Sequence, residues 1–166
     1  MLSVTHFRTV PLRISNEFRI VLTTMCRGAL IPKALWQFGK MISCIQPGVN
    51  PLIYNEYGCW CGFGGRGSPV DELDMCCKVH DKCYEASRSI PGCTAVVDLP
   101  HIQVYDYTCS NKQVTCPATN DKCQAATCKC DRDAAYCFAN AEYKPENKNL
   151  DSKVHCVNRV MQTHIN

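Results

Sequence analysis

The chain has 166 residues, enough for one domain with short appendages, and 14 of its 15 cysteines lie between Cys44 and Cys156. Cysteine at this density predicts a disulfide scaffold made in an oxidising compartment and argues against a cytosolic enzyme. Residues 1–33 hold five of the 18 basic and one of the 15 acidic residues, which leaves 13 basic and 14 acidic residues and no basic stripe for nucleic acid.

Zinc is the main alternative use for so many cysteines. Structural zinc sites favour pairs about two to four residues apart that repeat as modules. The closely spaced cysteines here, at 59 and 61, at 76 and 77, and at 128 and 130, do not repeat in that way. Disulfides are therefore the favoured interpretation.

Residues 1–33 are predicted to be a leader or propeptide and residues 157–166 a C-terminal extension, on either side of one domain at 34–156. The first segment is atypical, because charged residues are scattered through it and its longest suitable uncharged stretch is only Ile20 to Cys26. An atypical leader and a wrongly assigned first segment both explain this. No stretch approaches the ~18 consecutive apolar residues of a membrane-spanning helix.

The first predicted element of the domain is an amphipathic helix from Ala34 to Ile45. Leu35, Phe38 and Ile42 recur in it at helical spacing, a pattern that by itself is typical of a helix packed on a core. The prolines and the glycine at 47–51 predict that a loop follows.

The stretch from Tyr57 to Gly67 is too rich in glycine for a helix or an ordinary strand and is predicted to be a loop. A second helix is predicted next, with Ser68 as N-cap, Pro69 as first residue and Asp71 in the first turn. This helix is expected to extend to about Arg88.

Alternation and a Ser-Asn-Lys turn predict a short β-hairpin within Tyr105 to Thr115. A second long helix is predicted from about Asp121 to Ala139. Beyond Tyr143 the sequence is polar and irregular.

Cysteines predict how the two long helices pack. Each helix carries two cysteines seven residues apart, at 76 and 83 in the first and at 130 and 137 in the second, so each pair shares a face. Bridges 76–137 and 83–130 would require antiparallel helices, but spacing alone also allows the parallel pairing. In the antiparallel case His80 lies between the bridges and faces Asp131 or Asp133.

One stripe of the first long helix carries Cys77, His80, Asp81 and Tyr84. A buried histidine and aspartate need partners, because unpaired buried charge is costly. The nearby glycine-rich loop can turn several carbonyl oxygens toward one point, and carbonyls together with a carboxylate are ligands that calcium takes. Each feature alone is usually structural, and their combination indicates a site.

Four segments of the chain combine into a specific pattern. They are Ala34-Leu35-Trp36-Gln37-Phe38, Tyr57-Gly58-Cys59-Trp60-Cys61-Gly62-Phe63-Gly64-Gly65, Cys76-Cys77-Lys78-Val79-His80-Asp81-Lys82-Cys83 and Cys128-Lys129-Cys130-Asp131-Arg132-Asp133-Ala134-Ala135. Together they resemble the secreted phospholipase A2 family, and the short insertion Thr94 to Asp98 resembles its pancreatic type. The resemblance extends from Ala34 to Cys156. It implies a mainly α, disulfide-rich fold with two long antiparallel helices, an N-terminal amphipathic helix, a calcium loop and a small β-hairpin.

The resemblance implies an enzyme that hydrolyses the sn-2 ester of glycerophospholipids in a calcium-dependent reaction. His80 would activate water, and Asp131, in preference to Asp133, would hold the other ring nitrogen of His80. Tyr84 and Tyr105 would hydrogen-bond this aspartate.

The ion implied by the resemblance is Ca²⁺. The carboxylate of Asp81 would hold it together with the backbone carbonyls of Trp60, Gly62 and Gly64. The backbone N–H of Gly62 would help the ion to stabilise the oxyanion.

The lipid chains would occupy a channel lined by Leu35, Phe38, Ile42 and Tyr54, with Trp36 at a rim that faces the membrane. The implied partners are phospholipid aggregates and membrane surfaces, with a cell-surface receptor as a further candidate. The resemblance also implies that the protein is a secreted, extracellular monomer.

The resemblance also implies a zymogen. The amino group of Ala34 would belong to the mature site, and Lys33 offers a tryptic cut immediately before it. His101 departs from the family pattern, since relatives usually carry tyrosine or lysine there, near the substrate phosphate.

Seven bridges are implied by the resemblance: Cys44–Cys109, Cys59–Cys156, Cys61–Cys77, Cys76–Cys137, Cys83–Cys130, Cys93–Cys123 and Cys116–Cys128. Cys26 would be the odd cysteine. Two alternatives use the same scaffold without catalysis: a receptor ligand or toxin-like binding module, and a mineral-associated structural protein. The intact His80, Asp81, Asp131 and glycine loop argue against the first, and the neutral charge argues against the second.

Overall fold

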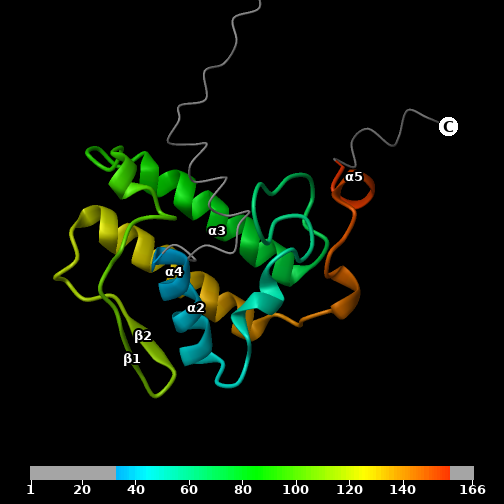
Figure 1. Cartoon of the computed structure of the whole chain (residues 1–166), viewed down its shortest axis with the longest axis horizontal. Coiled ribbons are helices and arrows are strands. Elements are labelled where there is room, and N and C mark those ends of the chain that lie inside the picture. Colours follow the sequence, from blue (N-terminus) through cyan, green and yellow to red (C-terminus); the bar gives the residue numbers. More distant parts are fainter. Residues whose placement is uncertain (1–32, 158–166) are drawn as a thin grey trace, which may run out of the picture. The chain divides into compact units, whose positions relative to one another are not determined.

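The computed structural model describes residues 33–157, so nearly all of the expected leader and of the expected C-terminal extension lies outside the described residues. The described part is mainly helical, with one small antiparallel sheet (Figure 1). In chain order its elements are α2 (Lys33–Ile45), η1 (Pro51–Tyr54), α3 (Glu72–Arg88), η2 (Val96–Asp98), β1 (Thr108–Ser110), β2 (Gln113–Thr115), α4 (Lys122–Asn140), η3 (Pro145–Asn147) and α5 (Ser152–His155).

The helix α3 begins later than the sequence predicts. Its N-cap is Asp71, whose side chain accepts a hydrogen bond from the N–H of Asp74 at 2.9 Å. The prediction of Ser68 as N-cap and Pro69 as first helical residue was therefore wrong. A second reason is that the N–H of Val70 is bonded to the Asp74 carboxylate at 3.0 Å, which holds this segment as a loop in front of the helix.

The helix α4 begins where the sequence predicts. Asp121 is its N-cap and accepts hydrogen bonds from the N–H groups of Cys123 and Gln124. The side chain of Gln124 accepts from the N–H of Asp121 in return, which completes a capping box.

The two long helices α3 and α4 pack against each other and are cross-linked twice. Cys76 is bonded to Cys137 and Cys83 to Cys130, so the antiparallel arrangement is confirmed. The other five bridges in the structure are Cys44–Cys109, Cys59–Cys156, Cys61–Cys77, Cys93–Cys123 and Cys116–Cys128. These are the seven pairs that the family resemblance implied. Cys26 lies outside the described residues.

The predicted hairpin is present but short. Thr108 pairs with Thr115 and Ser110 with Gln113. The two residues between the strands, Asn111 and Lys112, have φ of 50° and 62°, as a type I′ turn requires.

The helix α2 packs against α4, the hairpin and η1. Its buried face contributes Met41, Ile42 and Ile45 to a core that also contains Leu73 of α3 and Phe138 of α4. This packing places the apolar stripe of α2 beside the facing sides of the two long helices. Within the described residues, no helix combines the length and the apolar character needed to cross a membrane.

Candidate active site

His80 and Asp131 form a buried pair between the two long helices. The Nε2 atom of His80 lies 2.7 Å from Oδ1 of Asp131. Asp131 is fully buried and His80 is 9% exposed. Asp133, which spacing alone left open as the partner, instead lies on the helix surface and pairs with Lys129 and Arg132.

Two tyrosine hydroxyls complete the surroundings of Asp131. Tyr84 donates to Oδ1 and Tyr105 donates to Oδ2, each at 2.5 Å. Burial, followed by the nearby charge of Asp131, raises the pKa of both tyrosines well above 10. Both hydroxyls therefore keep their protons and act as donors, which compensates the buried carboxylate for the water it has lost.

This arrangement selects the tautomer of His80. The Asp131 carboxylate accepts hydrogen bonds, so the Nε2 atom of the neutral imidazole must carry the proton. The Nδ1 atom then holds a lone pair, and no hydrogen bond within residues 33–157 occupies it. An imidazole whose second nitrogen is fixed by a carboxylate in this way can act as a general base.

A row of aromatic rings leads away from His80. The ring of Phe38 on α2 stacks on His80, with centroids 4.6 Å apart and planes 24° apart. Phe138 on α4 lies 6.0 Å from Phe38 and 4.6 Å from Tyr54. Ile42, which is 2% exposed, belongs to the same core cluster, so an apolar wall reaches His80 through Phe38.

The glycine-rich loop is attached to α3 by one buried carboxylate. Asp74 accepts hydrogen bonds from the N–H groups of Cys59 at 2.8 Å and Trp60 at 2.7 Å. A Cβ on Gly58 would lie 2.3 Å from the Asp74 carboxyl carbon, so this close approach requires glycine. The bridge Cys61–Cys77 attaches the loop to the same helix a second time.

Several groups of this loop have no partner inside the described chain. The carbonyl oxygens of Trp60, Gly62 and Gly64 accept no hydrogen bond within residues 33–157, whereas those of Cys59, Cys61 and Gly67 do. Gly62 and Gly64 have φ of 131° and 82°, which side chains rarely tolerate. The loop therefore presents unsatisfied oxygens of the kind that hard cations bind.

Asp81 is the carboxylate that the sequence analysis assigns to such a cation. It follows the catalytic candidate His80 on α3, is partly buried, and forms no ion pair or side-chain hydrogen bond within the described residues. Burial raises the pKa of Asp81, as expected for a carboxylate that lacks a cationic partner. Among residues 33–157 no group of three or more His, Cys, Asp or Glu side chains could hold a metal ion, so a cation here would depend mainly on backbone oxygens. The donor set fits Ca²⁺ in kind.

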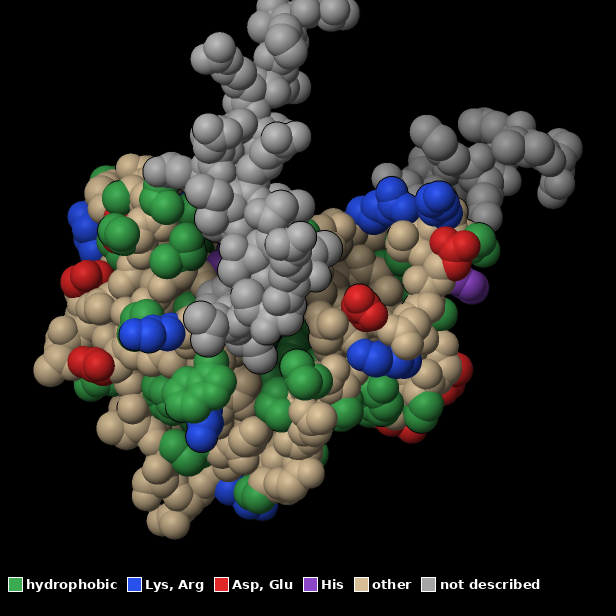
Figure 2. Space-filling model, in the orientation of Figure 1, with side chains coloured by type: hydrophobic (Ala, Val, Ile, Leu, Met, Phe, Trp, Pro, Cys, Tyr) green, Lys and Arg blue, Asp and Glu red, His purple; other side chains and the backbone are tan. Residues whose placement is uncertain are grey.

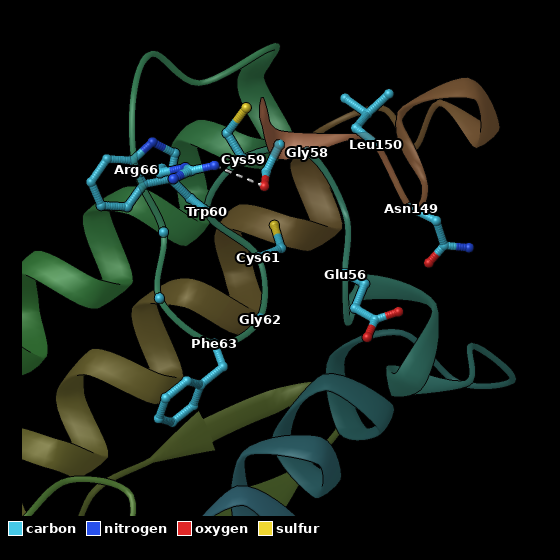
Figure 3. A pocket seen from close by; sticks show the side chains of 13 residues that line it. Glu56, Gly58, Cys59, Trp60, Cys61, Gly62, Phe63, Arg66, Asn149 and Leu150 are labelled. Atoms are coloured by element: carbon cyan, nitrogen blue, oxygen red, sulfur yellow. Dashed lines mark hydrogen bonds between the residues drawn. The ribbon is translucent and has the colours of Figure 1, made fainter. Parts of the chain in front are cut away.

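The same loop, including Trp60, Gly62 and Gly64, lines a cavity of about 520 Å³. Figure 3 shows the loop on one side of the cavity and Glu56 and Asn149 on the other. His80 and Asp81 do not line this cavity.

The family assignment follows from comparison with known proteins. The sequence model of the family described as phospholipase A2 matches residues 35–148. The chain belongs to the phospholipase A2 family. It is 51% identical over 121 residues to a phospholipase A2 from sheep (Ovis aries), an alignment that covers 72% of this chain and 98% of the sheep protein.

Two further relatives have similar identities. A phospholipase A2 from cattle (Bos taurus) is 48% identical over 128 residues, with 76% of this chain and 88% of the cattle protein covered. An acidic phospholipase A2 named KBf-grIB, from Bungarus fasciatus, is 50% identical over 126 residues. This alignment covers 75% of this chain and 89% of the Bungarus protein. The chain is thus a phospholipase A2, an enzyme that hydrolyses phospholipids.

Large apolar side chains of this phospholipase A2 remain in solvent near the site. Trp36 on α2 is 55% exposed, Leu52 on η1 is 62% exposed and Phe63 in the loop is 79% exposed. Figure 2 shows hydrophobic side chains at the surface beside α2, interspersed with single charged groups. The apolar wall that reaches His80 and these exposed residues therefore share two elements, α2 and η1.

His101 lies at the edge of the site of this phospholipase A2. Its ring makes an edge contact with the ring of Tyr84, with centroids 5.3 Å apart. Burial of the ring and then the neighbouring His80 lower the pKa of His101. The outer part of the residue remains exposed.

Sequence reasoning missed two residues that shape the site of this phospholipase A2. Phe138 lies seven residues after Asp131, hence on the same face of α4, and that spacing could have indicated it. Asp74 gave no such signal, because its partners are backbone N–H groups of a distant loop.

Proposed function

We propose that this phospholipase A2 hydrolyses the sn-2 ester of glycerophospholipids in a calcium-dependent reaction at a lipid–water interface. The observation that carries the proposal is the buried His80–Asp131 pair. Within residues 33–157 the Nδ1 atom of His80 has no hydrogen-bond partner, and the next residue, Asp81, has a carboxylate without an ion pair. Neutral charge outside residues 1–33 and several exposed apolar residues suit a zwitterionic or neutral lipid surface.

Proton transfer in this proposal uses His80 and Asp131. The Nδ1 atom of His80 takes a proton from a water molecule as the oxygen of that water attacks the sn-2 carbonyl carbon. Asp131 stabilises the imidazolium that forms, and the two tyrosine hydroxyls keep Asp131 oriented. When the tetrahedral intermediate collapses, the imidazolium returns the proton to the leaving oxygen, which releases a fatty acid and a lysophospholipid.

The glycine-rich loop and Asp81 would hold the ion. The ligands would be the Asp81 carboxylate and the carbonyl oxygens of Trp60, Gly62 and Gly64, all without protein partners within residues 33–157. Bound Ca²⁺ would polarise the ester carbonyl and neutralise charge on the oxyanion. The N–H of Gly62 also has no partner in this range and would donate to the same oxygen.

Leu35, Phe38, Ile42 and Tyr54 would line the path of the lipid chains to His80. Ile42 and Tyr54 are buried, and the stacked Phe38 ring excludes water from one side of the imidazole. Trp36 would contact the membrane surface. The protein would act as a secreted, extracellular monomer, and a cell-surface receptor is a further candidate partner.

Residues 1–33 would be a leader and propeptide whose removal after Lys33 yields the active form. Lys33 and Ala34 begin the described helix α2, and Ala34 is fully buried there. Residues 157–166 would be a C-terminal extension without a role in the chemistry.

The test is fatty-acid release from mixed phospholipid micelles, with calcium or with excess chelator, before and after brief trypsin treatment. Calcium-dependent release from the sn-2 position that increases after cleavage at Lys33 would support the reaction and the zymogen. Absence of release from disulfide-bonded, trimmed protein would contradict the proposed reaction.

A further inference from the structure

The side chain of Trp60 connects the two ends of the glycine-rich loop. Its Nε1 donates a hydrogen bond to the carbonyl of Gly67 at 3.2 Å. Its ring lies so close to Gly65 that a Cβ there would stand 2.5 Å from the indole Cε3 atom. The backbone closes at the same place, since the N–H of Arg66 donates to the carbonyl of Cys59 at 3.1 Å.

Trp60 is also attached to α3. Its N–H donates to Asp74, and the amino group of Lys78 lies 5.0 Å from the centroid of its ring. A cation over an indole face is attracted by the ring quadrupole. Asp81 follows Lys78 by three residues, so the indole is attached to the same helix as the proposed carboxylate ligand.

The segment that the indole spans contains the carbonyls proposed to bind calcium. Glycine loses more conformational entropy than other residues when its backbone is fixed, and positions 62, 64, 65 and 67 are all glycine. Contacts that order the loop before the ion arrives remove this cost from the binding step. Figure 3 shows Trp60 at one side of the loop, with Gly62 and Phe63 further along it.

We propose that the indole of Trp60 is a positioning element that orders the loop before calcium binds and thereby sets the calcium affinity. The inference rests on the proposed calcium dependence of the enzyme. The side chain acts through the backbone oxygens of Trp60, Gly62 and Gly64 and makes no contact with substrate in this proposal.

The test is calorimetric titration of the full disulfide-bonded chain with CaCl₂ in the absence of lipid. In Trp60→Ala the Kd for calcium is expected to rise about tenfold, because the hydrogen bond and the ring contacts are both lost. In Trp60→Phe it should rise about threefold, because the ring persists and only the hydrogen bond is lost.

Trp36→Phe is the matched control. Trp36 also carries a lysine over its ring, with Lys40 Nζ at 4.6 Å from the centroid, but it lies on α2 outside the loop. Its Kd for calcium should match that of the wild type. The variant also leaves Trp60 as the only tryptophan, so its emission during the titration reports on the loop.

Activity measurements separate positioning from a general structural role. The calcium concentration for half-maximal hydrolysis should rise in Trp60→Ala in parallel with the Kd, and excess calcium should recover most of the lost kcat. A Kd equal to that of the wild type, or a loss of kcat that excess calcium does not recover, would overturn the role of Trp60. Wild-type protein that binds no calcium, or that binds it equally well after Asp81→Asn, would instead contradict the proposed function together with this inference.

Discussion

Nε2 of His80 lies 2.7 Å from Oδ1 of Asp131, although the two residues are 51 positions apart in the chain. The bridges Cys76–Cys137 and Cys83–Cys130 connect the same two helices on either side of this pair. Sliding of one helix along the other would therefore strain both bridges. The covalent framework fixes the geometry on which the proposed proton transfer depends.

His80→Gln should reduce kcat by about 10²–10⁴-fold, because the amide cannot accept the proton from water. Calcium affinity should change by less than about twofold, since the proposed ligands remain. Steady-state hydrolysis and calorimetric titration measure the two effects. His155→Gln, at an exposed position on α5, is the matched control and should keep wild-type activity. Residual activity of the His80 variant above a few per cent would refute the assignment of His80 as base.

Asp81→Asn should lose calcium binding and activity together, because the other proposed protein ligands are neutral carbonyls. Wild-type protein should gain about 2.7 kcal/mol in free energy of unfolding at calcium one hundred times the Kd, and the variant should gain nothing. Thermal unfolding with and without calcium measures this difference. Glu85→Gln, one turn further along α3 and exposed, should retain the full gain. An unchanged calcium response in the Asp81 variant would exclude this carboxylate as a ligand.

Tyr84→Phe and Tyr105→Phe should each remove one hydrogen bond to the buried Asp131 carboxylate. Each change should lower the free energy of unfolding by about 1–3 kcal/mol, while kcat falls less than about tenfold because His80 keeps its own contact with Asp131. Denaturant unfolding and steady-state kinetics provide the measurements. The control is Tyr107→Phe, whose hydroxyl makes no hydrogen bond within residues 33–157. Equal stability of all three variants would show that the hydroxyls contribute nothing to holding Asp131.

Asp71→Asn should lower the free energy of unfolding by an amount that depends on pH. Burial raises the pKa of Asp71, but hydrogen bonds from Tyr57, Asp74 and Asn147 outweigh it and hold the pKa below its usual value. A group with a depressed folded pKa contributes stability above its unfolded pKa of ~3.9, and this contribution is lost as pH falls through the folded pKa. The wild type should therefore exceed the variant by about 1 kcal/mol at pH 7 and lose that advantage below about pH 4.

Guanidinium unfolding of the wild type and Asp71→Asn between pH 7 and pH 2.5 measures this effect. The comparison variant is Asp133→Asn, whose carboxylate also has a lowered pKa but lies in an exposed ion-pair cluster. This substitution should change the free energy of unfolding by no more than about 0.5 kcal/mol at pH 7. A constant difference between Asp71→Asn and wild type across the whole pH range would show that the ionised carboxylate makes no contribution.

Local sequence patterns were sufficient to predict that the two long helices and the hairpin exist. The predicted start of α4 near Asp121 is confirmed, and in the structure Asp121 and Gln124 form a capping box there. The start of α3 was placed wrongly at Ser68, because Asp71 and Asp74 also form contacts with residues outside the helix. Propensity rules do not include such contacts. The first residue of a helix is therefore hard to predict when the capping residues also bond to other parts of the fold.

Spacing within the sequence also placed His80 between two cross-links but left its partner open between Asp131 and Asp133. The family resemblance favoured Asp131, and the structure places Asp131 in the buried contact and Asp133 on the surface. Residues two positions apart in a helix lie on opposite sides of it. The rotation of α4 about its own axis therefore decides which of the two carboxylates is buried. That rotation depends on the packing of α2, α3 and α4 together.

By itself the sequence determined the class of scaffold and the order of its elements and indicated the residues proposed to carry the chemistry, because cysteine spacing, helical periodicity and glycine content are local properties of the chain. Only the tertiary structure decided that Asp74 anchors the loop, that Phe38 stacks on His80 and packs near Phe138, and that the Trp60 indole reaches Gly67. The physical reason is that these contacts depend on how packing and seven disulfides shape and assemble the segments, which no local pattern in the sequence encodes.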